Sequence, residues 1–436
     1  MDIKDEKFLI KGGKPLEGEV TVSGAKNSAT KLIVSSLLSK GKTVLTNSPN
    51  KINDVQVTAD ICRSIGSEIQ ITDDRLEIVT PEIKSTEIPQ DLGGTTRTAI
   101  LLAGPLLHRM GEARIPIPGG CRIGSRPVNY HIDALRKLGC EVDMDDFYYT
   151  LRADKLKGAN IRLEYPSVGA TENILIAATL AKGRTNISNA AIEPEIIDLI
   201  KYLQKMGAII EISTDRKITI EGVASLEGAC HRVIPDRNES ASFACAAIAS
   251  KGNVLVKDAI QDDLITFLNT IRKVGGGYKV KEDGIQFFYK DELKPIALET
   301  NVHPGFMTDW QQPFVVLLTQ AKGVSIIHET VYEKRFGYVS ELIKMGAEIE
   351  LFSQCLGGLT CRFANTDYNH SAVVKGKTDL HGAEIYVPDL RAGISYLIAG
   401  AIAGGESLIH GVYYLDRGYE NIDVKLRNLG AEIKRL

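Results

Sequence analysis

The sequence predicts an α/β protein with two domains, each built from three similar units of helices and strands. Three observations predict this organisation. The chain has 436 residues, more than one hydrophobic core usually serves, so two domains of about 200 residues each are expected. A helix that ends at Gly and leads into a strand recurs six times, and a second, apolar helix alternates with it.

The first repeated element is the helix that ends at Gly. Its copies follow one another at intervals of about 70 residues, with a longer last interval. Glycine adopts the left-handed conformation that ends a helix, and the residues after it can begin a strand. We therefore expect six helix ends, at Gly66, Gly139, Gly207, Gly275, Gly346 and Gly430.

The second repeated element is an apolar helix that ends at Gly and leads into another strand. Because most copies are apolar on nearly every face, each is predicted to be buried inside a domain. Residues 75–79 and 217–220 have the pattern of hairpin partners. The six helical copies span residues 32–41, 99–111, 174–183, 243–252, 314–323 and 394–404.

Six units divide naturally into three and three. The polar stretch 228–238 falls between the third and fourth units and is the predicted domain boundary. The strand-like segments 8–10 and 18–22 precede the first unit and could belong to either domain. The alternative is two unrelated α/β domains whose helix ends agree by coincidence, which six copies at similar spacing disfavour.

Composition excludes several classes of protein. Apolar residues make up 44% and charged residues 25% of the chain, as in an ordinary globular protein. A net charge of -3 gives no overall attraction to nucleic acid or to an anionic membrane. Because the sequence has no run of about 20 apolar residues, it predicts no membrane span. These features favour a small-molecule site.

Cysteine usage predicts a reduced, cytoplasmic environment. The chain has 7 cysteines, an odd number, without a CxxC pair and without a spacing that suggests a ligand cluster with histidine. No signal-peptide pattern precedes them. We therefore expect neither disulfides nor a metal centre.

One cysteine lies in an unusual setting. Cys121 stands in the segment 118–127, whose three glycines and two prolines argue against a helix or a central strand. Arg122 and Arg126 follow it, and a nearby positive charge favours the reactive thiolate. An inert thiol is the alternative, and from this segment alone it is favoured.

Several charged side chains stand at predicted helix starts. Lys26 opens the first apolar helix, where backbone N–H groups and the helix dipole attract anions, although the spacing of a nucleotide-binding P-loop is absent. Arg97 and Arg391 lie near equivalent helix starts and Arg417 on a turn, and guanidinium groups there suit phosphate or carboxylate. A solvated helix start or a surface ion pair is the alternative for each.

Asp309 follows the irregular segment 303–308 at the start of the fifth apolar helix. Its carboxylate could serve as the N-cap of that helix, which this segment alone favours. If it faces a cleft, it could instead accept a proton from a substrate hydroxyl. The charged helix starts 193–195 and 333–336 are interpreted as mainly structural.

Together these motifs resemble the enolpyruvyl transferases, and most closely the branch that acts on UDP-N-acetylglucosamine in peptidoglycan synthesis. The most specific match is the loop 119–124 followed by Arg126-Pro127-Val128 and His131, because loop, spacing and register agree. The similarity runs nearly the whole length of the chain. Its other segments are 18–27, 166–171, 235–237, 308–309, 389–391 and 416–420.

The resemblance implies a fold of two inside-out α/β barrels with three units each. The first domain would comprise residues 23–232, and the second residues 1–22 plus 233–436. The active site would lie in the cleft between them. No metal and no organic cofactor are implied.

The resemblance also implies a reaction. The enolpyruvyl group of phosphoenolpyruvate would pass to the 3-hydroxyl of UDP-N-acetylglucosamine with release of phosphate, by addition and then elimination, in the first committed step of peptidoglycan synthesis. Asp309 would be the base and Cys121 the acid, a division that the sequence leaves open. The cations that hold the phosphate and carboxylate would be Lys26, Arg126, Arg391 and Arg417. The sugar-nucleotide side would be lined by Asn27, Arg97, Arg126, Pro127, Val128, Asn129, Tyr130, His131, Ser167, Val168, Gly169 and Val331.

The chain departs from the family mostly on the acceptor side. Asn129-Tyr130 stands where the family commonly has Asp- or Gln-type residues, and Thr96-Arg97-Thr98-Ala99 replaces the usual Met-Arg-Ala-Ser. Trp310 replaces a usual Met, and Asn238 a usual aliphatic residue. A paralogue with another nucleotide or sugar acceptor is therefore the first alternative. A shikimate-type transferase is disfavoured by the Gly-Gly-Cys loop, and a non-catalytic binding protein by the joint presence of Cys121, Asp309, Lys26 and Arg417.

Overall fold

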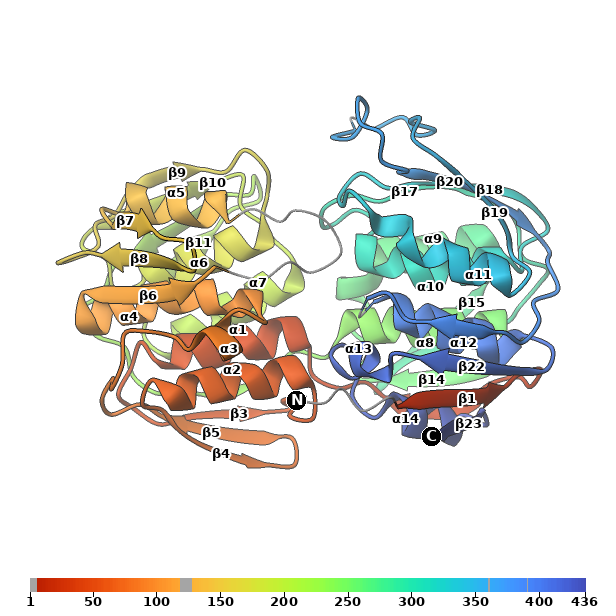
Figure 1. Cartoon of the computed structure of the whole chain (residues 1–436), viewed down its shortest axis with the longest axis horizontal. Coiled ribbons are helices and arrows are strands. Elements are labelled where there is room, and N and C mark those ends of the chain that lie inside the picture. Colours follow the sequence, from red (N-terminus) through yellow and green to blue (C-terminus); the bar gives the residue numbers. More distant parts are fainter. Residues whose placement is uncertain (1–5, 118–127, 360, 390) are drawn as a thin grey trace. The chain divides into compact units, whose positions relative to one another are not determined.

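The computed structural model describes residues 6–117, 128–359, 361–389 and 391–436 (Figure 1). Its described residues form two compact units. One unit contains residues 6–23 and 235–436, and the other contains residues 24–117 and 128–234. The chain thus passes from one unit to the other at 23–24 and returns at 234–235.

The unit of residues 24–234 alternates helices and strands. Its helices are α1 (Lys26–Ser36), α2 (Asn53–Ser64), α3 (Gln90–Gly93), α4 (Ala103–Met110), α5 (Asn129–Lys137), α6 (Val168–Ala178) and α7 (Pro194–Lys205), with the 3₁₀ helix η1 (Arg97–Leu102) before α4. Its strands are β3 (Thr43–Thr46), β4 (Glu68–Thr72), β5 (Arg75–Val79), β6 (Glu112–Pro116), β7 (Glu141–Met144), β8 (Tyr148–Arg152), β9 (Asn160–Arg162), β10 (Arg184–Ser188), β11 (Ile209–Ile212), β12 (Ile218–Glu221) and β13 (Cys230–Arg232).

The other unit alternates in the same way. Its helices are α8 (Arg237–Ala249), α9 (Ile265–Val274), α10 (Thr308–Leu318), α11 (Val339–Lys344), α12 (Ala392–Ile402), α13 (Val412–Asp416) and α14 (Ile422–Asn428), with the 3₁₀ helices η2 (Asp262–Leu264) and η3 (Arg335–Tyr338). Its strands are β1 (Lys7–Lys11), β2 (Glu17–Thr21), β14 (Asn253–Lys257), β15 (Gly277–Lys281), β16 (Gly284–Phe288), β17 (Ala297–Glu299), β18 (Gly323–His328), β19 (Glu348–Phe352), β20 (Ser371–Gly376), β21 (Glu384–Tyr386), β22 (Glu406–His410) and β23 (Glu432–Arg435).

The described strands form six small open sheets, and the predicted α/β class is confirmed. Five sheets share one arrangement, in which a parallel pair is followed by two antiparallel strands; their orders are β13-β3-β5-β4, β9-β10-β12-β11, β2-β14-β16-β15, β17-β18-β20-β19 and β21-β22-β1-β23. The sixth, β6-β8-β7, has a parallel bridge between Glu87 and Arg114 where the other sheets have a fourth strand. The predicted hairpin strands at 75–79 and 217–220 are present as β5 and β12.

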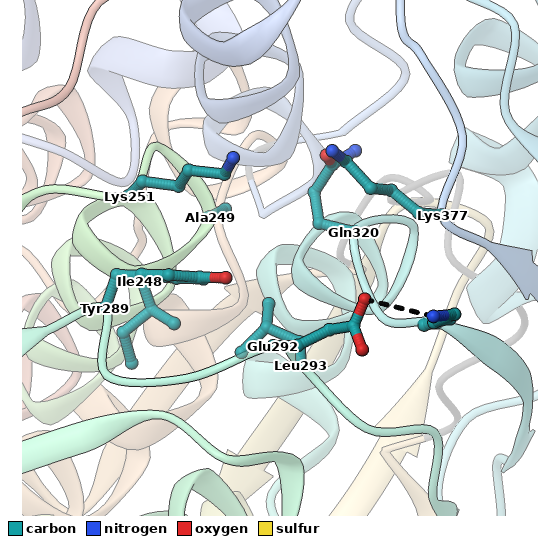
Figure 2. Close-up of a pocket in the computed structure, with 9 residues that line it drawn as sticks. Ile248, Ala249, Lys251, Tyr289, Glu292, Leu293, Gln320 and Lys377 are labelled. Carbon is teal, nitrogen blue, oxygen red and sulfur yellow. Dashed lines mark ion pairs between the residues drawn. The ribbon is translucent and has the colours of Figure 1, made fainter.

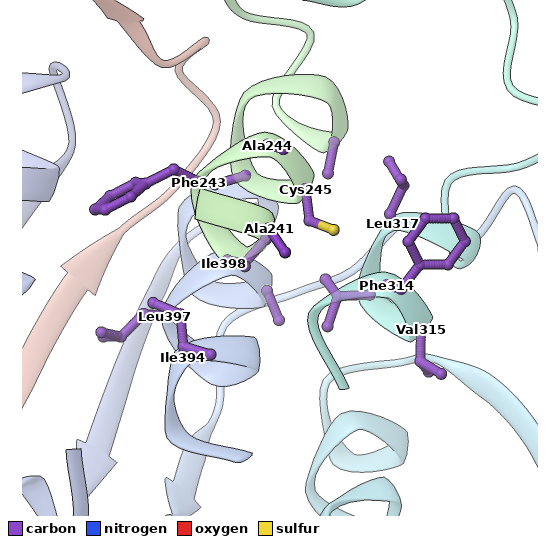
Figure 3. Close-up of a cluster of buried hydrophobic side chains, with 14 of the residues drawn as sticks. Ala241, Phe243, Ala244, Cys245, Phe314, Val315, Leu317, Ile394, Leu397 and Ile398 are labelled. Atoms are coloured by element: carbon purple, nitrogen blue, oxygen red, sulfur yellow. The ribbon is translucent and has the colours of Figure 1, made fainter. Parts of the chain in front are cut away.

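The apolar helices form the interior of each unit. All residues of α8 are buried, and α8, α10 and α12 contact one another. Figure 3 draws buried side chains of all three helices, among them Cys245, Leu317 and Ile398. In the other unit, α1 and α6 both contact the η1–α4 segment. The prediction of buried helices is therefore confirmed. A helix that is apolar all round can satisfy its surface only by contacts on every side.

The six predicted helix ends are confirmed. All six glycines have positive φ, from 92° at Gly139 to 119° at Gly66. The strand that follows each glycine lies at the edge of its sheet. For the second set the prediction is wrong in detail, because α1, α6 and α10 end several residues before Gly41, Gly183 and Gly323.

The N-terminal strands complete sheets that are otherwise built from distant residues. β1 pairs with β22 and β23, and β2 pairs with β14. The polar stretch 228–238 is also structured: β13 pairs with β3, Asp236 caps α8, and Arg237 and Asn238 are buried. Most of its polar side chains are thus enclosed rather than solvated as in a linker, although Arg232 is exposed.

Among the described residues, no helix is both long enough and apolar enough to cross a bilayer.

Candidate functional site

The carboxylate of Asp309 lies between two arginine side chains. Asp309 stands in the first turn of α10, and its Oδ1 accepts a hydrogen bond from Arg335 Nη2 at 2.6 Å. Its Oδ2 lies 3.4 Å from Arg391 Nε. Both arginines are buried, whereas the Asp309 side chain is 21% exposed. The carboxylate is therefore partly accessible, and two buried guanidinium groups balance its charge.

Arg391 is held in place by the start of α12. It is the N-cap residue of that helix, and Asp389 Oδ1 accepts hydrogen bonds from the backbone N–H groups of Arg391 and Ala392. Burial opposes the charge of Arg391, but Asp309 and Tyr419 outweigh it, and the pKa of the guanidinium is raised. Arg391 Nη1 is buried and has no hydrogen-bond partner among the described residues. That N–H group is a donor available to an anion.

Glu329 organises the segment between β18 and η3. Its Oε2 accepts hydrogen bonds from Thr308 Oγ1 and Gln311 Nε2, both on α10, at 2.9 and 3.0 Å. Its Oε1 accepts hydrogen bonds from the backbone N–H groups of Val331 and Tyr332. One buried carboxylate thus fixes the partly exposed Val331 beside the helix that carries Asp309.

The interpretation of Asp309 as an N-cap is wrong. Met307 is the N-cap residue of α10, and its side chain makes no capping bond. The interpretation of 333–336 as mainly structural missed Arg335, which contacts the candidate base. Its only signal in the sequence was an arginine within a charged run, and such runs are usually solvated.

Lys26 is a buried cation at the start of α1. Its Nζ donates a hydrogen bond to Asp54 Oδ2 at 2.9 Å, and Asp54 lies in the first turn of α2. Asn27 follows it and is partly exposed. The structure therefore confirms the predicted helix start and adds Asp54, which sequence reasoning did not identify.

Several residues predicted on the acceptor side meet in one place. The ring of His131, in α5, lies against the start of α6, because a Cβ added at Gly169 would be 3.1 Å from His131 Cε1 and Nε2. Ser167 is the N-cap of α6, and its Oγ accepts a hydrogen bond from the N–H of Ala170. Burial, with a smaller contribution from Arg97, lowers the pKa of His131 to about 3. The imidazole is consequently neutral at physiological pH.

Among the remaining predicted residues, some lie in helices α5, α6 and α13, and the others fall outside the residues that the structure describes. Val128 is buried at the start of α5, Asn129 is exposed, Tyr130 is partly buried, and Val168 is partly exposed in the first turn of α6. Arg417 caps the C-terminus of α13, with its guanidinium carbon 6.0 Å from the centre of the Tyr413 ring. Cys121, Arg126 and Pro127 lie outside the described residues.

Two departures from the family pattern occupy buried positions. Trp310 lies within an aromatic cluster with Phe267 and Phe306, and the guanidinium of Arg237 lies 5.7 Å from the centre of its ring. Asn238 is buried in the first turn of α8. Trp310 therefore contributes to packing behind Asp309.

The sequence model of the EPSP synthase family, described as EPSP synthase (3-phosphoshikimate 1-carboxyvinyltransferase), matches residues 10–426. The chain belongs to the EPSP synthase family. A UDP-N-acetylglucosamine 1-carboxyvinyltransferase of Protochlamydia amoebophila is 52% identical over 97% of this chain and 93% of its own. One of Halothermothrix orenii is 41% identical over 99% of each.

Solved structures of the family agree in fold. The enolpyruvyl transferase NikO from Streptomyces tendae has a TM-score of 0.87 at 22% identity, covering 99% of both chains. An EPSP synthase from Acinetobacter baumannii has a TM-score of 0.75 at 17% identity, covering 99% of this chain and 100% of its own. At these identities the likeness shows a shared family fold.

A polar hollow elsewhere in the unit of residues 235–436 does not include the residues predicted from the family resemblance. It encloses about 170 Å³ near the C-terminal ends of α8 and α10, where Figure 2 shows Ile248, Lys251, Gln320 and Lys377 around it. Asp309 stands at the opposite, N-terminal end of α10. Lysines near helix C-termini are stabilised by the helix dipole, which gives Lys251 a structural role.

The structure brings cysteine and histidine together where no sequence spacing indicates it. A ring nitrogen of His328 and the Sγ atoms of Cys355 and Cys361 all lie within 4.8 Å of one another. The cluster combines a strand end with a distant loop, so no short spacing in the sequence reveals it. Nothing in the family resemblance assigns a metal to these residues.

Proposed function

We propose that this protein transfers the enolpyruvyl group of phosphoenolpyruvate to the 3-hydroxyl of UDP-N-acetylglucosamine, with release of phosphate, in peptidoglycan synthesis. The observation that carries the proposal is the full-length identity of 52% and 41% with two proteins that bear the name of this activity. We also place the protein in the cytoplasm, where its substrates are made and thiols stay reduced.

Proton transfer is assigned to two residues. Asp309 accepts the proton of the acceptor hydroxyl, and Cys121 delivers one to the methylene carbon of phosphoenolpyruvate in the addition step. Support for Asp309 comes from its partial exposure and its two buried arginine partners, which fix the orientation of both oxygens. Cys121 is assigned from the loop motif alone.

Anion binding is assigned to four cations: Lys26, Arg126, Arg391 and Arg417. They balance the carboxylate and phosphate charge of phosphoenolpyruvate and the charge that develops during addition. The unpaired Nη1 of the buried Arg391 supports this role. So does the position of Lys26 at a helix N-terminus, where the dipole adds to its charge.

Recognition of the sugar nucleotide is assigned to Asn27, Arg97, residues 126–131, Ser167, Val168, Gly169 and Val331. The proximity of Arg97, His131 and Gly169 supports a single subsite on the unit of residues 24–234. A neutral His131 can offer a lone pair as well as an N–H to uncharged groups of the acceptor.

We also propose a fold that is more detailed than the α/β class. We infer six copies of one unit, arranged as two inside-out barrels with domains 23–232 and 1–22 plus 233–436, and an active site in the cleft between them. Five sheets of identical strand arrangement support the repeat.

The test measures phosphate release from phosphoenolpyruvate with one acceptor at a time: UDP-N-acetylglucosamine, UDP-glucose and shikimate 3-phosphate. We expect release with UDP-N-acetylglucosamine only. Release only with UDP-glucose would favour the paralogue with another acceptor, and release only with shikimate 3-phosphate would favour the shikimate branch. No release from folded protein with any of them would reject the transferase activity.

A further inference from the structure

The connection between β19 and β20 carries two cysteines and ends at a histidine. This connection, residues 353–370, contains no helix or strand among its described residues and is the blue segment that extends beyond β19 and β20 in Figure 1. Connections of this length without secondary structure are uncommon unless they bind something. Cys355 is exposed and Cys361 is partly buried, so both thiols can be reached from solvent.

Two histidines face these thiols, and their tautomers follow from their hydrogen bonds. The Oγ–H of Ser371 is donated to the carbonyl of Gln354 at 2.7 Å, so Ser371 Oγ accepts a hydrogen bond from His328 Nδ1 at 2.9 Å. The carbonyl of Tyr368 can only accept, so His370 Nδ1 donates to it at 2.7 Å. In both rings the proton is on Nδ1, and Nε2 carries a lone pair.

One of the two Nε2 atoms lies against a thiol, and the other has no hydrogen-bond donor beside it. His370 Nε2 lies 3.3 Å from Cys355 Sγ. His328 is fully buried, and its Nε2 has no hydrogen-bond partner among the described residues. An unpaired nitrogen in a buried ring is costly, and a ligand that accepts its lone pair would remove the cost. The two rings lie 5.4 Å apart.

The surroundings hold this arrangement in place. Glu299, in β17, accepts hydrogen bonds at 2.8 Å from the backbone N–H groups of Gly358 and Leu359. The N–H of Phe363 donates to Cys361 Sγ at 3.3 Å, a contact that stabilises a thiolate. Both arms of the connection are therefore anchored around the cysteines.

We propose that Cys355, Cys361, His328 and His370 form a structural Zn²⁺ site. Two thiolates and two neutral imidazoles are a common tetrahedral zinc set, in which each histidine donates its other N–H to a backbone or side-chain oxygen. Zinc bonds of about 2.3 Å to sulfur and about 2.0 Å to nitrogen separate the ligand atoms by about 3.3 to 3.8 Å. The observed separations, 3.3 Å for Cys355 to His370 and at most 4.8 Å among His328, Cys355 and Cys361, allow closure by small side-chain movements.

The test uses the reduced full-length protein without a histidine tag, loaded with Co²⁺ and then with Zn²⁺. We expect about one equivalent of Co²⁺ with the ligand-field bands of a tetrahedral site and a thiolate-to-cobalt charge-transfer band, both lost when Zn²⁺ displaces it. Zn²⁺ should also raise the thermal unfolding midpoint. The variants C355S and C361S should lose the charge-transfer intensity of their thiolate and bind at least about 10-fold more weakly.

The matched control is C230S, because Cys230 is also exposed but lies in β13, away from the cluster. It should keep the spectrum, the stoichiometry and the zinc-dependent midpoint of the parent protein. A parent protein without the thiolate band would overturn the proposal, as would spectra of C355S and C361S that are unchanged from that of the parent. A Cys355–Cys361 disulfide that forms in air and cannot be prevented by Zn²⁺ would also overturn it.

Discussion

At the scale of the residue, Asp309 is the point on which the proposed chemistry depends. D309N keeps the shape of the side chain but removes its ability to accept a proton. We expect kcat to fall about 10²- to 10⁴-fold, the usual contribution of a general base. Steady-state phosphate release at saturating substrates measures this. D262N is the matched control, since Asp262 is exposed at the start of η2, and its kcat should equal that of the parent.

Arg335 is a positioning residue for the same carboxylate. R335Q should lower kcat more than it changes KM for either substrate, because it frees Asp309 from its 2.6 Å contact. The lost partner should also cost about 3 kcal/mol of unfolding free energy. R335K, which retains the charge, should recover part of both losses. An unchanged kcat in folded R335Q would contradict the positioning role.

His131 should make stability depend on pH. Its pKa falls from 6.5 to about 3 on folding, chiefly through burial and secondarily through Arg97. The folded state therefore favours the neutral ring, so stability is fully present above the unfolded pKa and is lost as pH falls toward 3. Between about pH 7.5 and about pH 5 the parent should lose about 2 kcal/mol more than H131Q.

Denaturant unfolding at both pH values measures this difference. Any loss of unfolding free energy that H131Q causes equally at both pH values cancels from it. H381Q is the control, because His381 is exposed, and it should follow the parent. Parallel pH dependences of the parent and H131Q would reject the buried neutral ring.

The residue scale also shows what the sequence could not predict. Lys26 and Asp309 stand at predicted helix starts, and local pattern was enough to place them. Arg335 and Asp54 were missed because their importance lies in a contact with a residue far along the chain, and an isolated arginine or aspartate resembles any solvated charge. The glycines and prolines around Cys121 predict a loop, but they do not predict which residues the loop contacts.

At the scale of the element, glycine C-caps give a clean test of backbone strain. Gly430 has a φ of 93°, and an added Cβ would meet no atom within 4 Å, so G430A changes conformational energy alone. We expect a loss of about 1 kcal/mol in unfolding free energy. Gly337 has equal space for a Cβ without a positive φ, so G337A should be neutral or slightly stabilising. Equal losses in both would contradict this explanation.

Helix α6 carries a buried carboxylate that should oppose folding at high pH. Burial raises the pKa of Glu172 from 4.5 to about 7, against the attraction of Lys31. The protonated form is favoured by the fold, so its contribution is present below pH 4.5 and is lost as pH rises through 7. From about pH 5 to about pH 8 the parent should lose about 2.5 kcal/mol relative to E172Q.

Calorimetric or denaturant unfolding of the parent and E172Q at the two pH values measures the effect. E164Q is the control, because Glu164 is exposed before the same helix, and it should retain the pH dependence of the parent. The prediction fails if E172Q retains it too.

Helices and helix ends were predicted correctly where the type of side chain alone determines them. Apolar residues on every face indicated the central helices, and glycine indicated the C-caps, because burial and φ are local consequences of side-chain type. The exact helix ends before Gly41, Gly183 and Gly323 were not predicted. Several residues near a helix end can stop it, and tertiary contacts decide among them.

At the scale of the whole molecule, each unit has its chain ends close together. Asp236 N donates to Ser23 O at 2.8 Å in one unit, and Ala25 N donates to Ile234 O at 2.7 Å in the other. Residues 24–234 alone, and residues 1–23 joined to 235–436 by a short glycine linker, should each fold cooperatively. Circular dichroism with thermal unfolding measures this. Noncooperative melting of both chains would contradict the prediction.

Sequence repeats predicted the α/β class because a periodic pattern of caps and strands is itself a fold-level signal. They left the assignment of segments 8–10 and 18–22 open, since strand pairing over long separations leaves no local trace. The proposed zinc ligands were hidden for the same reason. Each is ordinary in its own segment, and the pairing of β18 with β20 brings His328 opposite Ser371, next to His370.

The pairing of β1 with β22 and β23 also affects how the protein is made. Residues 7–11 leave the ribosome long before residues 406–410, so a strand with two buried apolar side chains, Phe8 and Ile10, remains without its neighbours during most of translation. Such a contact is slow to form and leaves an unpaired edge that can associate with other chains. Slow synthesis or a missing chaperone should therefore harm the unit that contains the chain's first strands before it harms the other.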